Sequence, residues 1–65
     1  MKMWMVYDET DGHVVNESEA YGEIEDYGNI DDPCCYLGDL NEAVKIAERL
    51  REGTGHRFSL RMWSQ

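Results

Sequence analysis

The feature that most constrains the fold is an amphipathic stretch at residues 39–52. Asp39 can cap the start of a helix there, with Glu42 completing a capping box, and Gly53 supplies a C-terminal stop. A helix with one apolar stripe must cover another apolar layer, so the rest of the chain has to provide that layer. The stripe recurs at helical spacing and consists of Leu40, Ala43, Val44, Ala47 and Leu50.

Three stretches have the character of strands and can form this layer. Residues 2–7 are aromatic, branched or large and apolar. Residues 13–17 follow Asp11-Gly12, a pair typical of hairpin turns, and residues 56–63 alternate between apolar and polar side chains. We expect an α+β fold, with a small three-stranded, mainly antiparallel sheet packed on one main helix. The predicted core is Val6, Val14, Leu40, Val44, Ala47, Leu50, Phe58 and Leu60.

The stretch from Ser18 to Asp32 admits two interpretations. Asn16 and Glu19 fit a capping box and favour a short helix, whereas Gly22 costs a helix about 1 kcal/mol relative to Ala. The sequence also repeats, because Tyr-Gly-Glu-Ile-Glu-Asp is followed at once by Tyr-Gly-Asn-Ile-Asp-Asp. A six-residue period keeps the faces of a strand in register. We expect either a short acidic helix or an extended segment between the second strand and the main helix.

Length and cysteine content indicate one small domain spanning residues 1–65. A chain of this size buries only about 60% of its unfolded surface, so its stability is marginal. Cys34 and Cys35 are adjacent and are too close for an unstrained bridge. Free thiols favour a reducing compartment, and residues 3–7 are too short an apolar run for an export signal. We expect a cytoplasmic monomer without contact to a membrane.

The distribution of charge is unusual. Between Met3 and Val44 there are twelve acidic residues and no Lys or Arg, while the rest of the chain carries six basic and two acidic residues. The net charge of −8 therefore divides into a −12 segment and a +4 remainder. Such a segment repels nucleic acid and nucleotides. The acidic segment could be a solubilising surface or a surface that binds a basic partner. Ordinary surfaces mix both signs of charge, so the absence of interleaved Lys gives the two interpretations equal weight.

Candidate catalytic and metal sites are weak. Cys34, Cys35, His13 and His56 could in principle ligate zinc, but structural zinc sites space their cysteines by two to four residues. The acids nearby should raise a thiol pKa and make it unreactive. We therefore predict no enzyme activity, no metal and no cofactor.

Tyrosine is concentrated in the acidic segment, at Tyr7, Tyr21, Tyr27 and Tyr36. Aromatic side chains surrounded by charged residues are typical of protein interfaces, although the same side chains could fill the core. Trp4, Phe58 and Trp63 are expected to be structural. The predicted partner-binding residues are Glu17, Glu19, Tyr21, Glu23, Glu25, Asp26, Tyr27, Asp31 and Asp32.

The spacing of these acids suggests what they could bind. In an extended segment the pairs Glu17/Glu19 and Glu23/Glu25 would each lie about 6.6 Å apart on one face. Successive phosphates of a DNA strand are separated by a similar distance, on the order of 6–7 Å. In a helical segment Glu19, Glu23 and Asp26 would share a face instead. Either conformation predicts a row of charges that a DNA-binding groove could accept.

In size, charge segregation, free cysteines and the acidic run from Glu17 to Asp26, the chain resembles phage-encoded anti-CRISPR and antirestriction inhibitors of the DNA-mimic type. The resemblance implies an inhibitor in the host cytoplasm that blocks target-DNA binding by a CRISPR effector complex. It implies a basic DNA-binding surface as the partner. Two alternatives remain open: an antitoxin or immunity-type protein that neutralises a basic toxin or nuclease, and a regulatory binding domain that inhibits nothing.

Overall fold

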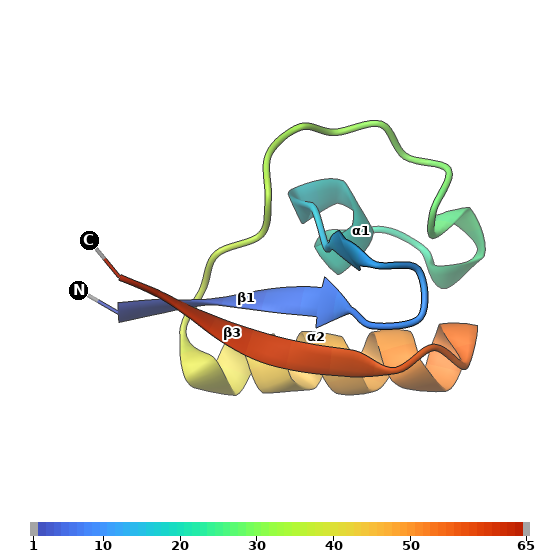
Figure 1. Ribbon diagram of the computed structural model, residues 1–65. Helices are drawn as coiled ribbons and strands as arrows, with labels where there is room; N and C mark the ends of the chain where they lie inside the picture. The colour runs from blue at the N-terminus through green and yellow to red at the C-terminus, as the bar shows by residue number, and fades with distance from the viewer. Residues whose placement is uncertain (1, 65) are drawn as a thin grey trace.

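The computed structural model describes residues 2–64 and has the expected α+β architecture (Figure 1). Three antiparallel strands form one sheet in the order β2-β1-β3, with α2 packed against it. A short helix lies between the second strand and the main helix, so the prediction of this topology is confirmed. In chain order the elements are β1 (Lys2–Asp8), β2 (His13–Val14), α1 (Glu17–Tyr21), the 3-10 helix η1 (Ile24–Asp26), α2 (Leu40–Thr54) and β3 (Phe58–Ser64).

The sheet has one covered and one open face. β1 pairs with β3 over seven residues, and Val6 lies opposite Leu60 in this register. Because side chains alternate along a strand, Trp4 and Val6 share the face that packs against the core, together with Phe58 and Leu60. The residues between them, such as Tyr7, belong to the open face.

The second strand is shorter than the predicted 13–17. β2 contains only His13 and Val14, because the side chain of Asn16 accepts a hydrogen bond from Glu19 N–H and begins α1. The extended backbone still continues as far as this cap, since Val15 N–H donates to Val6 O at 2.8 Å. The predicted hairpin turn is present, with Gly12 at a φ of 78°, a conformation that glycine adopts without strain.

The main helix begins as predicted and ends two residues later than predicted. The Asp39 side chain accepts from Glu42 N–H at 2.8 Å, but the Glu42 side chain does not complete a capping box because it binds two tyrosines instead. The stop is Gly55, which has the left-handed φ of 77°. Gly53 lies inside the helix, where a Cβ atom would lie 2.8 Å from Ile24 Cδ1. Its role is to let η1 approach α2.

The core differs from the predicted one in its details. Val6 and Leu50 are fully buried, and Ala47, Phe58 and Leu60 pack around them. Leu40 was predicted to be buried but is 45% exposed, and Val14 is half-buried beside Tyr7 on the open face. Val44 is also only half-buried. The prediction missed the buried residues Val15, Ala20, Tyr36, Ala43 and Ile46.

The third strand is displaced by one or two residues from the predicted 56–63, since it spans Phe58–Ser64. His56 precedes it because its ring binds Asp8 at the end of β1. Trp63 was expected to be structural, yet it is 38% exposed. Among residues 2–64, no helix combines the length and apolar character needed to cross a membrane.

Candidate functional site

The predicted partner-binding residues all belong to the segment 15–38, which contains α1 and η1. In Figure 1 this segment extends from β2 on the side of β1 that faces away from β3. Most of its acids are turned outward. We call the exposed acidic side chains of this segment, together with the exposed ring of Tyr21, the acidic surface. Its members are Glu17, Tyr21, Glu23, Glu25, Asp26 and Asp31.

Three of the predicted residues do not belong to this surface. Glu19 is only 4% exposed, Tyr27 is half-buried against the core, and Asp32 is half-buried. The row of acids predicted for either conformation is therefore incomplete, because Glu19 was needed in both versions. The carboxylate of Asp32 accepts from Ser18 Oγ at 2.8 Å and Cys34 N–H at 3.0 Å. It joins α1 to the loop that follows η1.

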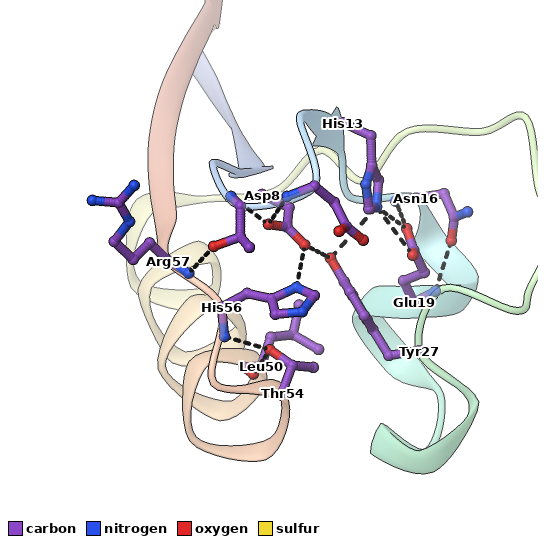
Figure 2. A network of polar contacts seen from close by, with 11 residues as sticks. Asp8, His13, Asn16, Glu19, Tyr27, Leu50, Thr54, His56 and Arg57 are labelled. Carbon is purple, nitrogen blue, oxygen red and sulfur yellow. Dashed lines mark hydrogen bonds and ion pairs between the residues drawn. The ribbon is translucent and has the colours of Figure 1, made fainter.

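Glu19 has a structural role at the start of α1. Its Oε1 accepts from Asn16 N–H at 3.1 Å, while Asn16 Oδ1 accepts from Glu19 N–H at 2.7 Å. This is the predicted capping box, and it is confirmed. The same carboxylate lies 3.1 Å from His13 Nε2 (Figure 2), so Glu19 also ties α1 to β2.

A fully buried carboxylate, that of Asp8, holds four elements together (Figure 2). Its Oδ1 accepts from the backbone N–H groups of Thr10 and Asp11, each at 2.9 Å. Its Oδ2 accepts from Tyr27 O–H at 2.9 Å and lies 2.8 Å from His56 Nδ1. Because a carboxylate only accepts, His56 must carry a proton on Nδ1. The end of β1 is thereby linked to the hairpin, the segment after η1 and the approach to β3.

Burial and the hydrogen bonds around this carboxylate shift the pKa values of Asp8, His56 and Tyr27. Burial on its own would raise the pKa of Asp8, but the hydrogen bonds from Asp11, His56 and Tyr27 outweigh burial and lower it. The hydrogen bond to Asp8 raises the pKa of His56, which burial opposes. Burial, followed by the bond to Asp8, raises the pKa of Tyr27 far above its ordinary value. The Tyr27 hydroxyl therefore stays protonated and donates to Asp8.

α1 is held at its other end by a basic residue from α2. Arg49 Nη1 donates to Gly22 O at 2.9 Å, and Arg49 Nη2 donates to Ala20 O. Such carbonyls at a helix C-terminus lack partners within the helix, and a cation there is favourable. The guanidinium of Arg49 thus fixes the acidic segment on α2.

Tyr21 contributes the exposed aromatic ring of the acidic surface. Its side chain is 64% exposed, and its ring meets Tyr36 edge-on at a centroid distance of 5.8 Å. Tyr36 is fully buried and donates to Glu42 Oε1 at 2.5 Å, while Tyr21 O–H donates to the same oxygen at 3.2 Å. Burial, the bond to Glu42 and the charge of Glu17 raise the pKa of Tyr21. An exposed ring is therefore held in one place among carboxylates.

The cysteines and histidines do not assemble as a zinc site would require. Cys34 and Cys35 are exposed, whereas each histidine faces a buried carboxylate. The charge of Asp32, with smaller effects of burial and Glu17, raises the pKa of Cys34, which is the predicted direction. Within residues 2–64, the one group with metal-ligand geometry is Asp8, Asp11 and His56, whose ligand atoms lie within 4.8 Å of one another. Both oxygens of Asp8 already accept hydrogen bonds there.

Sequence reasoning missed the network around Asp8. One signal was present, because Asp8 continues the alternation of Trp4 and Val6 and so belongs on the buried face of β1. Comparison with family models, with curated proteins and with solved structures found no match to this chain.

Proposed function

We propose that the chain is an inhibitory binding protein whose acidic surface occupies the basic DNA-binding surface of another protein in place of DNA. The observation that carries the proposal is the separation of charge within the fold. Residues 3–44 contain no Lys or Arg, and the guanidinium of Arg49, which reaches this segment from α2, is occupied by the carbonyls of α1. Among residues 2–64, the carboxylates of the acidic surface form no ion pair with Lys, Arg or His, so their negative charge is available to a basic partner.

The rigidity of the segment supports the same proposal. Three contacts hold α1 and η1 in place. They are the capping box of Asn16, the hydrogen bond from Tyr27 to Asp8 and the hydrogen bond from Arg49 to Gly22. A surface that is already ordered loses little conformational entropy on binding. Among basic DNA-binding proteins, we propose a CRISPR effector complex as the target, in keeping with the resemblance to DNA-mimic inhibitors.

The exposed ring of Tyr21 favours a second candidate, an immunity-type protein that covers a basic toxin or nuclease. In such proteins a packed aromatic anchor contributes much of the affinity. The single ring of Tyr21, 64% exposed and held edge-on by Tyr36, has this geometry. In this case shape complementarity around Tyr21 would dominate, and the carboxylates would mainly accelerate association.

Capture experiments can separate the two candidates. The immobilised chain is exposed to bacterial lysates at low salt, and bound proteins are eluted first with duplex DNA and then with high salt. A DNA mimic should release a DNA-binding protein or nucleoprotein complex when duplex DNA is added. An immunity-type protein should release a small basic enzyme, and Tyr21→Ala should increase its dissociation rate strongly. Recovery of the same proteins on an immobilised Glu23→Lys/Glu25→Lys variant would contradict the DNA mimic, and an unchanged dissociation rate for Tyr21→Ala would contradict the immunity-type protein.

A further inference from the structure

The edge of the sheet formed by β3 is open, in contrast to the opposite edge. Beyond β1 on the other side, the extended chain at Val15 pairs with the loop, since Tyr36 N–H donates to Val15 O at 3.0 Å. Gly38 also forms a bridge to Trp4. Within residues 2–64, the only strand neighbour of β3 is β1, so one side of a seven-residue strand is left without a partner.

The register shows which groups are free at this edge. Glu9 N–H donates to Arg57 O at 2.8 Å, so residues 57, 59, 61 and 63 direct their backbone groups toward β1 in the alternating antiparallel pattern. Phe58, Leu60 and Met62 therefore direct their N–H and C=O groups outward. These are the unsatisfied groups to which another strand can bind.

An apolar groove lies beside these free groups. It has a volume of about 170 Å³, and it is open to solvent between β3 and α2. A strand added beyond β3 would direct every second side chain toward this groove, because residues opposite each other in a ladder share a face. The groove is lined by Val44, Ala47, Glu48, Arg51, Phe58 and Leu60.

The charge around the edge is opposite to that of the acidic surface. Arg61 of β3 and Arg57, which directly precedes this strand, are exposed and belong to the open face of the sheet, and Arg51 borders the groove. Two acidic residues reduce this positive charge. Glu48 lines the groove, and Glu9 Oε1 lies 3.7 Å from Arg61 Nη2. Pairing of β3 with a second copy would gather four guanidinium groups on one face, which is unfavourable. An acidic strand is the complementary occupant.

We propose that the β3 edge binds an extended peptide in which apolar and acidic residues alternate. In the antiparallel register, a peptide Glu-Val-Glu-Val-Glu places its valines opposite Leu60 and Phe58, over the groove. Its first and last glutamates lie opposite Arg61 and Arg57. The valine N–H groups then face the outward carbonyls of β3. This site is separate from the acidic surface and does not depend on the function proposed for that surface.

Titration of the full chain with acetyl-Glu-Val-Glu-Val-Glu-amide, followed by NMR, tests this proposal. We expect saturable shifts at Phe58, Leu60 and Met62, together with slower amide hydrogen exchange at these positions. Methylation of both valine nitrogens, which removes two donors but keeps the side chains, should abolish binding. Replacement of the glutamates by lysines should weaken it. Shifts confined to other surfaces, or equal binding of the methylated peptide, would overturn the proposal.

A pair of charge reversals gives a matched control. Arg57→Glu should weaken binding of the acidic peptide by about threefold to tenfold and improve binding of its lysine counterpart. Lys45→Glu makes the same change in charge at an exposed position of α2 outside the groove lining, and it should have a smaller effect. Equal effects of the two variants would show attraction by net charge alone and would overturn the proposed register. Shifts of β3 with protein concentration, without peptide, would assign the edge to a second copy and also overturn it.

Discussion

His56 Nδ1 lies 2.8 Å from Oδ2 of Asp8, and this contact joins the segment before the last strand to the end of the first strand. Asp8 is fully buried, and its second acceptor oxygen binds the hairpin. A single buried carboxylate is thus shared by the sheet, the hairpin and the segment after η1. An unpaired buried charge is costly, so the stability of the fold should depend on the protonation of this pair.

The first prediction concerns pH. The pKa of His56 is raised in the folded state, so its stabilising effect is complete below the unfolded value of about 6.5 and is lost as pH rises through the folded value. The pKa of Asp8 is lowered, so its effect is complete above the unfolded value of about 3.9 and is lost as pH falls through the folded value. The contribution of the pair is therefore largest between about pH 4 and about pH 6.5.

Thermal unfolding of wild type and His56→Asn between pH 4 and pH 9 measures this contribution. Asn can still donate a hydrogen bond to Asp8 but does not titrate, so the decrease in Tm of wild type above about pH 6.5 should flatten in the variant. Tyr27→Phe serves as the control, because it removes a donor to Asp8 and keeps the titrating histidine. It should lower Tm while preserving the dependence on pH. Parallel curves for wild type and His56→Asn would contradict the prediction.

The second prediction concerns Gly53, which sequence analysis took for the helix stop. Ala at this position should favour the helix by up to about 1 kcal/mol. Its Cβ would nevertheless lie 2.8 Å from two carbon atoms of Ile24, Cγ1 and Cδ1. Overpacking of this kind costs about 1–3 kcal/mol, so we expect Gly53→Ala to destabilise the protein. Urea unfolding measures the change.

A double-mutant cycle provides the control for Gly53. Ile24→Ala should itself destabilise the protein, because Ile24 packs against the core. When it is combined with Gly53→Ala, the added methyl group should fill part of the vacated space. The two changes should therefore be strongly non-additive. Additive free energies of unfolding would show that the contact between η1 and α2 does not limit the residue at position 53.

The third prediction compares two leucines of α2 that the sequence placed in one stripe. Leu50 is fully buried, whereas Leu40 is 45% exposed. Leu50→Ala should reduce the free energy of unfolding by about 2–5 kcal/mol, which would unfold much of a marginal domain. Leu40→Ala should change it by no more than about 0.5 kcal/mol. Similar losses for both variants in urea unfolding would contradict the observed orientation of the helix.

The sequence predicted most of the topology because the strongest patterns are local. The alternation of Phe58 and Leu60 and the helical period up to Leu50 identify their elements without tertiary information. Boundaries were less accurate, because tertiary contacts decide them. Gly53 lies against Ile24, so the stop moves to Gly55.

The candidate site could be predicted only in part. Charge segregation can be read directly from the sequence, but which acids are buried cannot. Glu19 is turned inward by its contacts with Asn16 and His13, and Tyr27 by its bond to Asp8. The bond of Tyr27 joins residues 19 positions apart in the chain, and no local pattern reports it. The capping-box motif of Asn16 and Glu19 was recognised, yet its consequence for the acidic row was not.

The last prediction tests the acidic surface. Glu23 and Glu25 are exposed, and Glu23 makes no side-chain cap bond to η1. Glu23→Lys/Glu25→Lys should therefore leave the fold intact and relieve repulsion among the acids, so that Tm holds or rises. Glu48→Lys/Glu52→Lys makes the same change in net charge at exposed positions of α2. Affinity for the captured partner is then measured for both variants at several salt concentrations.

If carboxylates on the acidic surface contact a basic groove, the first variant should lose about tenfold or more in affinity, while the second loses little. The affinity of wild type should fall with salt through screening of the matched charges. Its dependence on salt should be shallower than that of duplex DNA, which also releases condensed counterions on binding. Equal affinities of wild type and the Glu23/Glu25 variant would mean that these two acids make no contact with the partner, and the proposal of DNA mimicry would fail.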